Sequence, residues 1–204
     1  MFFTNQGTKK YHYILPLILQ KVGYVISWVI LKIFVRLEIN GAENLKNIDK
    51  PLILASNHTS EIDPAIFALV LPLFSKHFPV YFVSYPEGKY NQFGLRSYLY
   101  GGTIFNIFGA YPIAYGKKDY KLALENHINL LQLGRTVCIF PEGKITKDGN
   151  LSFGHGGVAY LSYTTKTSVV PIAINTFFIR FFKIPLSLLR DAFHHRPFHI
   201  QELF

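Results

Sequence analysis

The sequence of 204 residues alternates short apolar runs with segments in which apolar residues recur at helical spacing. Short apolar runs bounded by turn residues are typical of buried strands, and the longer spacing is typical of amphipathic helices. Strands are predicted at 51–56, 80–84, 135–140 and 168–174. Helices are predicted at 65–71, 87–99, 119–133 and 158–165, and a turn, a short helix and a strand at 101–112. Strands that alternate with helices in this way predict an α/β fold, a three-layer sandwich with a largely parallel central sheet.

A long apolar segment at 13–35 precedes the first predicted strand. As a helix it is long enough to cross a bilayer, at about 1.5 Å per residue. However, Lys21 and Lys32 lie inside it, and each lysine costs about 2.5–3.5 kcal/mol at the membrane centre. The two lysines are about three helical turns apart and share one face, which favours a helix lying in the membrane interface with its lysines toward lipid phosphates. A tilted membrane span and a helix packed on the core remain alternatives.

The rest of the chain contains no linker, internal repeat or low-complexity segment. We therefore divide it into an N-terminal membrane-associating helical segment, residues 1–40, and one domain, residues 41–204. After the last predicted strand the pattern weakens. Residues 176–189 fit either paired strands or a second membrane-facing surface. Residues 190–204 are predicted to form a solvated tail, whose three histidines are weak evidence for a metal site.

The composition is apolar and basic at the same time. Half of the residues are apolar and only 16% are charged, against about 25% in an average globular domain. The formal net charge of +9 favours an acidic partner. Because the basic residues are scattered and no nucleic-acid-binding signature occurs, we expect an anionic membrane surface as a partner and no nucleic acid.

Cys138 is the one cysteine, so no disulfide can form within the chain. It lies in an apolar run and is predicted to be a small buried residue. A chain without disulfides is compatible with a reducing compartment. Together with the predicted membrane contact, this leads us to expect a location at the cytoplasmic face of a membrane.

A polar cluster at 57–63 follows the first predicted strand and opens a predicted helix. It holds His58 and Asp63, and Pro64 suits the first turn of the helix. On a regular helix, side chains five positions apart diverge by about 140°. The two side chains can therefore meet only if His58 lies on the turn and Asp63 in the first helical turn. A histidine beside an orienting carboxylate is a general base near neutral pH, but Asp63 as a plain helix cap and His58 as a loop residue remain an alternative.

A second polar turn follows a later strand, in the run Phe140-Pro141-Glu142-Gly143-Lys144. Open α/β sheets usually bind ligands at the carboxyl ends of their strands, where both polar turns are predicted to lie. Pro141 stiffens the turn and Gly143 permits a close backbone approach, while Glu142 and Lys144 offer opposite charges to a polar ligand. An ordinary turn leaving a strand is the alternative.

Four blocks in this order resemble the lysophospholipid acyltransferase family, whose best-known members are the lysophosphatidic acid acyltransferases. They cover residues 57–63, 109–113, 140–143 and 170–174, within a match of roughly residues 50–175. Ordered co-occurrence of several blocks is far more specific than any one of them. The resemblance implies that residues 41–204 are an acyltransferase domain.

The resemblance also implies roles for individual residues. His58 would deprotonate the hydroxyl of an acceptor lipid and Asp63 would orient it, while Glu142 and Gly143 would help to bind the acceptor. The acyl donor would be a thioester of coenzyme A or of acyl carrier protein, used as a co-substrate. No metal, no cofactor and no covalent acyl-enzyme is implied.

The chain departs from the family at two positions. The second block of the family usually ends in an arginine that binds the acceptor phosphate, and Tyr115 stands at that position here. The third block usually continues with Thr or Ser, and Lys144 stands there. Lys144, Lys117 and Lys118 are therefore candidates to supply the positive charge, unless the acceptor lacks a phosphate. Expected substrate-binding residues are Glu142, Gly143, Lys144, Tyr115 and Lys117.

Two other functions remain as alternatives. A lipid hydrolase could use the same His–Asp pair to activate water, although no Gly-x-Ser-x-Gly nucleophile motif occurs in the chain. A noncatalytic lipid-binding or scaffold relative of the family would bind lipid without consuming a thioester.

Overall fold

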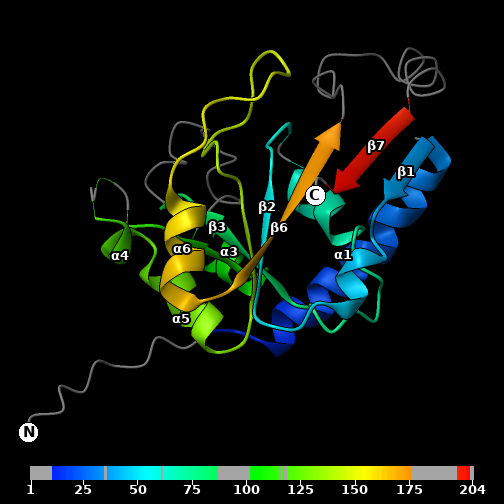
Figure 1. Ribbon diagram of the computed structural model, residues 1–204. Helices are drawn as coiled ribbons and strands as arrows, with labels where there is room; N and C mark the ends of the chain where they lie inside the picture. Colours follow the sequence, from blue (N-terminus) through cyan, green and yellow to red (C-terminus); the bar gives the residue numbers. More distant parts are fainter. Residues whose placement is uncertain are drawn as a thin grey trace, which may run out of the picture.

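The computed structural model describes residues 11–34, 36–60, 62–86, 102–114, 116, 119–175 and 197–202. In this part of the chain seven strands form one sheet in the order β1-β7-β6-β2-β5-β3-β4 (Figure 1). The strands are β1 (Arg36–Asn40), β2 (Leu52–Ser56), β3 (Val80–Ser84), β4 (Ala110–Pro112), β5 (Thr136–Ile139), β6 (Ser168–Asn175) and β7 (Pro197–Glu202). The five strands from β6 to β4 are mutually parallel, and β7 and β1 run in the opposite direction. The predicted α/β fold with a largely parallel sheet is confirmed.

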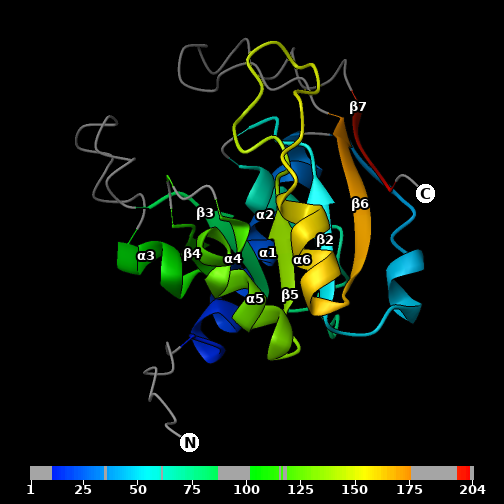
Figure 2. The same ribbon diagram turned by 60° about the vertical axis from the view of Figure 1, so that its left-hand side comes forward.

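The helices lie on both faces of this sheet (Figure 2). They are α1 (Ile14–Phe34), α2 (Asp63–Ala68), α3 (Gly102–Ile107), α4 (Tyr120–Ala123), α5 (Glu125–Gln132) and α6 (Gly157–Thr165), with a short 3₁₀ helix, η1 (Asn44–Asn47). Alternate residues of the central strands point to opposite faces, because side chains in a strand alternate. Leu52 and Leu54 of β2 pack into a core shared with α1 and α2, whereas Ile53 packs into a second core with α5 and α6. The result is the predicted three-layer sandwich.

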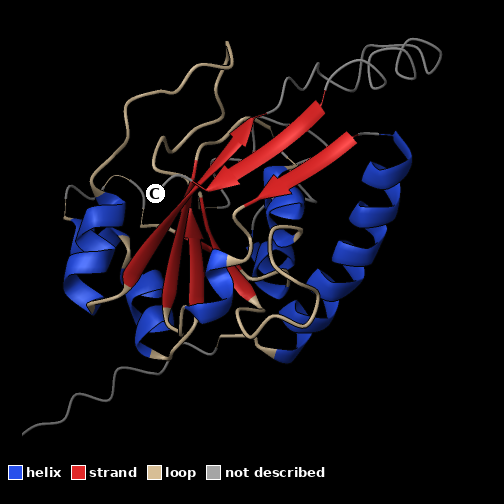
Figure 3. Ribbon diagram, turned by 45° about the vertical axis from the view of Figure 1, so that its right-hand side comes forward, coloured by secondary structure: helices blue, strands red, loops and turns tan. Residues whose placement is uncertain are grey.

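Helix α1 is attached to the sheet by one buried polar side chain, Gln20. Its amide nitrogen donates hydrogen bonds to the carbonyl oxygens of Val80 (2.7 Å) and Phe108 (2.8 Å), and its amide oxygen accepts one from the Val80 backbone nitrogen (2.9 Å). A Cβ atom at Gly109, whose φ is +91°, would stand 3.0 Å from the Gln20 amide nitrogen. The glycine in the second family block therefore lets α1 approach the start of β3. Figure 3 shows α1 lying along one side of the sheet.

Two predictions of secondary structure are wrong. The segment predicted as one helix at 119–133 is two helices, because Asp119 caps α4 and Leu124 interrupts the helical backbone at φ −106° and ψ 15°. The solvated tail predicted at 190–204 contains β7, which pairs with β6 on one side and with β1 on the other. β7 satisfies backbone groups along the edge of β6 that a tail in solvent would leave unpaired.

Further predictions concern the boundary of the N-terminal segment, Cys138 and several other segments of the chain. The sheet begins at Arg36, inside the N-terminal segment predicted at 1–40. Cys138 is fully buried in β5, as predicted. Burial raises the pKa of its thiol, and the negative charge of Asp63 raises it further. The helix predicted at 87–99, the strands predicted at 176–189, and His194 and His195 lie outside the described residues.

His127 on α5 predicts a dependence of stability on pH. Its ring is fully buried, and burial lowers its pKa from 6.5 to about 4, with backbone groups of Phe82 and Tyr111 opposing the shift. Between these values the unfolded chain binds a proton that the folded protein does not, so stability is full above about pH 6.5 and falls as the pH is lowered. We expect the free energy of unfolding to drop by about 2 kcal/mol between about pH 7 and pH 5 through this residue.

Urea unfolding of the unmodified protein and of His127→Leu at the two pH values measures this contribution. Leucine fills much of the volume and has no proton to bind, so the variant should lose less stability on acidification. An equal loss of stability in both proteins would show that His127 does not cause the dependence.

Candidate active site

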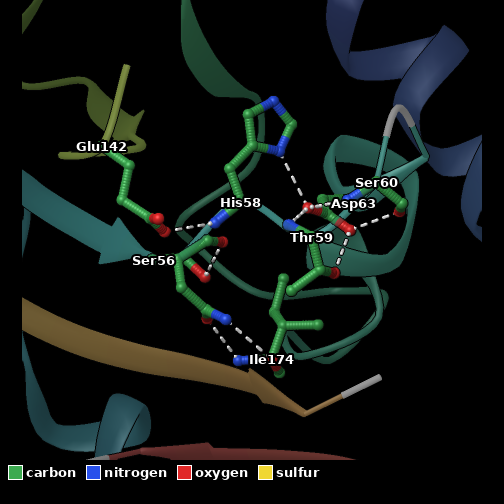
Figure 4. Close-up of polar contacts among 8 residues, drawn as sticks. Ser56, His58, Thr59, Ser60, Asp63, Glu142 and Ile174 are labelled. Atoms are coloured by element: carbon green, nitrogen blue, oxygen red, sulfur yellow. Dashed lines mark hydrogen bonds and ion pairs between the residues drawn. The ribbon is translucent and has the colours of Figure 1, made fainter. Parts of the chain in front are cut away.

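His58 and Asp63 meet on the turn between β2 and α2, at the carboxyl edge of the parallel strands (Figure 4). The His58 Nδ1 and Asp63 Oδ2 atoms are 2.8 Å apart. Asp63 is the first residue of α2 and Pro64 follows it in the first turn. The turn brings the side chains together as the sequence requires, since on one continuous helix they would diverge.

Asp63 holds the turn together from inside the protein. Its side chain is fully buried and its carboxylate accepts hydrogen bonds from the backbone nitrogens of Thr59 (2.6 Å) and Ser60 (2.9 Å). The hydroxyl groups of the same two residues donate to its other oxygen, at 3.1 Å and 2.6 Å. Donors converge on both oxygens, so the carboxylate has one fixed orientation. This orientation directs Oδ2 at the His58 ring.

The His58 ring is oriented by two contacts. Its Nδ1–H donates to Asp63, and the other ring nitrogen, Nε2, points away from the carboxylate (Figure 4). The ring stacks on Phe140, with centroids 4.1 Å apart and an angle of 14° between the planes. Its side chain keeps 18% of its surface exposed. In the neutral tautomer that Asp63 favours, Nε2 carries the lone pair that can take a proton.

Glu142 is connected to the backbone of the same turn. One carboxylate oxygen accepts a hydrogen bond from the His58 backbone nitrogen (3.1 Å) and the other from the Ser152 backbone nitrogen (2.7 Å). The residue is only 5% exposed. The carboxylate therefore joins the His58 turn to the loop that follows β5, a position suited to holding His58 in place.

Gly143 and Lys144 lie at the start of that loop. Gly143 has a φ of +64°, which favours glycine, and a Cβ there would stand 3.3 Å from the His155 ring. The Tyr85 hydroxyl donates a hydrogen bond to the Gly143 carbonyl. The Lys144 side chain is exposed at the same edge of the sheet. Tyr115, Lys117 and Lys118 lie outside the described residues.

Asn57 is a residue of this site that the sequence prediction missed. Its side-chain amide accepts a hydrogen bond from the Ile174 backbone nitrogen (2.7 Å) and donates one to the Ile174 carbonyl (2.8 Å). The Asn57 amide therefore makes the two hydrogen bonds to the end of β6 that the backbone of a further β2 residue could make. Asparagine directly before His58 was the signal in the sequence, but its partner is distant along the chain.

No group of three or more His, Cys, Asp or Glu side chains that could hold a metal occurs within the described ranges. The functional groups that the structure brings together are an imidazole, a buried carboxylate and a second carboxylate bound to backbone. This combination is suited to proton transfer at a hydroxyl group.

The model of the family described as Acyltransferase matches residues 36–175, and the chain belongs to this family. A chloroplastic 1-acyl-sn-glycerol-3-phosphate acyltransferase of Arabidopsis thaliana is 30% identical over 142 residues, which cover 69% of this chain and 36% of that protein. A lyso-ornithine lipid O-acyltransferase of Pseudomonas aeruginosa is 27% identical over 126 residues, covering 62% of this chain and 43% of that protein. The chain thus spans less than half the length of these relatives.

The fold is also similar to a solved structure, that of the 1-acyl-sn-glycerophosphate acyltransferase PlsC from Thermotoga maritima. The TM-score is 0.57 at 19% sequence identity, and the similarity covers 92% of this chain and 67% of that one. The resemblance to lysophospholipid acyltransferases found in the sequence is confirmed.

Proposed function

We propose that the protein is an O-acyltransferase that moves a fatty acyl group from a thioester to a hydroxyl of a lysophospholipid or a related lipid. The observation that carries the proposal is the 2.8 Å contact between His58 and the fully buried Asp63, in a chain of the acyltransferase family. Such a pair supplies a base of fixed tautomer at the edge of the sheet where ligands usually bind.

The reaction begins when Nε2 of His58 takes the proton of the acceptor hydroxyl. The acceptor oxygen attacks the thioester carbonyl carbon and forms a C–O bond. The C–S bond then breaks. The thiolate leaves with the proton that the imidazolium returns, so His58 ends the cycle neutral. Asp63 stabilises the imidazolium in between. In this proposal the acyl group never bonds to the enzyme, and no metal or cofactor takes part.

The substrates are lipids and acyl thioesters. The named relatives act on 1-acyl-sn-glycerol-3-phosphate and on lyso-ornithine lipid, which supports a lipid acceptor with one acyl chain. The acyl donor is a thioester of coenzyme A or acyl carrier protein. Lys144 is exposed beside the site and supplies the charge for an anionic head group. Tyr115 and Lys117 are further candidates for this contact.

The enzyme binds its acceptor lipid at the cytoplasmic face of a membrane. Over Ile14–Ile33, helix α1 has a mean hydropathy of 1.9 and is long and apolar enough to cross a membrane. Signal sequences and the core helices of soluble proteins can have the same length and hydropathy. Its exposed apolar residues include Ile14, Ile18, Val22, Val25, Ile26, Trp28, Val29, Ile30 and Ile33. Because Gln20 attaches α1 to β3, an orientation along the membrane interface fits better than an independent span.

An apolar hollow supports the same orientation of α1. It has a volume of about 400 Å³ and lies between α1 and Phe74, with Lys21 at its edge. The Lys21 ammonium group is 5.3 Å from the centre of the Phe74 ring. An apolar surface with a cation at its border is suited to the region between lipid tails and phosphates.

Thiol release tests the proposed reaction. The purified protein, mixed with an acyl-CoA or an acyl carrier protein thioester, should release thiol only when a lysolipid is added. Equal release without a lysolipid would indicate a hydrolase. Lipid binding without any thiol release from either donor would indicate a noncatalytic relative.

Glu142→Gln tests whether Glu142 positions His58 or binds the acceptor. Glutamine keeps the size of the side chain but turns an NH₂ group toward one of the two backbone donors. We expect kcat to fall about 10–100-fold, the value of a hydrogen bond to a charged group, while KM for the acceptor stays within about threefold. The matched control is Glu43→Gln, an exposed glutamate directly before η1, which should leave both constants nearly unchanged. A raised KM at normal kcat would instead assign Glu142 to acceptor binding.

A further inference from the structure

The loop between β5 and α6 projects beyond the carboxyl ends of the strands. Figures 1, 2 and 3 all show this projecting loop, residues 141–156, rising above the sheet edge that carries His58. Its base is fastened to the site by hydrogen bonds. The Thr146 backbone nitrogen donates to the His58 carbonyl (2.9 Å), and the His155 backbone nitrogen donates to the Pro141 carbonyl (2.8 Å). Together with Glu142, these bonds fix where the projecting loop stands relative to the catalytic pair.

The tip of the projecting loop has an ordered turn. The Thr146 hydroxyl donates to the Asn150 carbonyl (2.8 Å) and accepts from the Gly149 backbone nitrogen (3.1 Å). Asp148 accepts from the backbone nitrogen and the side-chain amide of Asn150, at 3.1 Å and 3.0 Å. The Asp148 carboxylate is thus hydrogen-bonded within the turn. The side chains that follow are presented outward by a defined backbone.

Two large apolar side chains stand exposed immediately after this turn. Leu151 is 76% exposed and Phe153 is 93% exposed. Ser152 lies between them and is half-buried, with its backbone nitrogen donating to Glu142, whereas the two apolar side chains on either side of it are exposed to solvent. Single exposed apolar residues are ordinary on a protein surface. Here two of them flank Ser152, which is hydrogen-bonded to Glu142, and Glu142 is hydrogen-bonded to the backbone of His58.

The charges of the projecting loop indicate what covers it. Lys144 and Lys147 are exposed on the segment leading to the tip, and the whole chain carries a net charge of +9. Apolar side chains next to lysines are the combination that inserts into lipid while contacting anionic head groups. An acidic protein would pair with the lysines but would gain little from two isolated apolar side chains beside a turn.

We propose that Leu151 and Phe153 insert into the surface of a bilayer that contains anionic phospholipid, and that the projecting loop thereby places His58 against the membrane. The inference rests on the proposed function, because it explains how a lipid acceptor reaches the base. It adds a second membrane contact to the exposed face of α1.

Vesicle binding tests the projecting loop without any measurement of activity, so its failure is distinguishable from failure of the proposed function. The test compares the unmodified protein with Leu151→Ser/Phe153→Ser on phosphatidylcholine vesicles with and without phosphatidylglycerol. We expect the double variant to bind roughly tenfold more weakly or worse, since two apolar side chains are lost. Lys147→Gln should weaken binding about fivefold, and only on the anionic vesicles. The matched control is Leu133→Ser, an exposed leucine just after α5, which should bind normally.

The single tryptophan of the chain permits a direct measurement of depth. In a Trp28→Phe background, Phe153→Trp places a reporter on the projecting loop, and Leu133→Trp places one at the control position. With vesicles containing brominated lipids, fluorescence from position 153 should shift to shorter wavelength and be quenched, while position 133 stays unchanged. A reporter at 153 that remains unquenched on bound vesicles would overturn the proposal. Normal vesicle binding by the double variant would also overturn the proposal. This holds even if the double variant loses activity with acyl carrier protein thioesters alone.

Discussion

His58→Ala is expected to lower kcat for acyl transfer by roughly 10²–10⁴-fold, the contribution of a positioned general base. The Nδ1 contact with Asp63 leaves Nε2 as the proton acceptor, and alanine removes both nitrogens. The ring is partly exposed and packs mainly on Phe140, so its loss should leave the fold intact. Steady-state kinetics with saturating thioester and lysolipid measure the effect.

The matched control for this variant is His12→Ala. His12 has an exposed side chain, and its backbone nitrogen and carbonyl, which alanine keeps, make its bonds to Tyr111 and Tyr81. Circular dichroism and thermal unfolding should be the same for both variants and the unmodified protein. Normal turnover by folded His58→Ala would refute the assignment of the base.

Asp63→Asn is expected to reduce both activity and stability. The His58 ring and the backbone nitrogens of Thr59 and Ser60 all donate to Oδ2, whereas the hydroxyl groups of Thr59 and Ser60 donate to Oδ1. An asparagine NH₂ group at the Oδ2 position would face three donors, and at the Oδ1 position it would require both hydroxyl groups to accept instead of donate. Leaving a buried donor unsatisfied costs about 1–3 kcal/mol, which urea unfolding measures. Where the NH₂ group faces His58, the ring adopts the tautomer whose Nε2 is protonated and cannot act as a base. We expect kcat to fall by about 10²–10⁴-fold.

An exposed ion pair provides the control for Asp63→Asn. Asp49 contacts Lys76 at 2.6 Å on the surface, and hydrogen bonding to Lys76 lowers the pKa of its carboxyl group. Asp49→Asn removes the same charge without burial, so kcat and the free energy of unfolding should change little. If Asp63→Asn behaved like Asp49→Asn, the buried carboxylate would have no part in holding the His58 turn.

The strands of the sheet were largely predictable because their signal is local. Apolar runs bounded by turn residues predicted β2, β3, β5 and β6 to within a few residues. The same reasoning predicted that His58 and Asp63 could meet only across the turn, because the constraint comes from helix geometry between near neighbours. Local pattern failed at β7, whose reason for being a strand is the pairing with β6 and β1.

The contacts that hold the site in place were not predictable from the sequence. Glu142 was expected to bind the acceptor, and nothing local indicates that its oxygens accept from the backbone of His58 and Ser152. Gln20 is one of several polar residues that interrupt the apolar pattern of α1, and its role appears only when β3 lies beside it. In each case a polar side chain satisfies backbone groups of a distant segment, and such partners are set by the tertiary fold.

Mass spectrometry of the reaction products tests the central claim most directly. The unmodified protein and folded His58→Ala would each be incubated with a panel of lysolipids and with acyl-CoA or acyl carrier protein thioesters. We predict a lipid product heavier by one acyl group with the unmodified protein, formed from at least one acceptor and nearly absent with the variant. The same product at the same rate from both proteins, or free fatty acid alone, would contradict a histidine that activates the acceptor hydroxyl for acyl transfer.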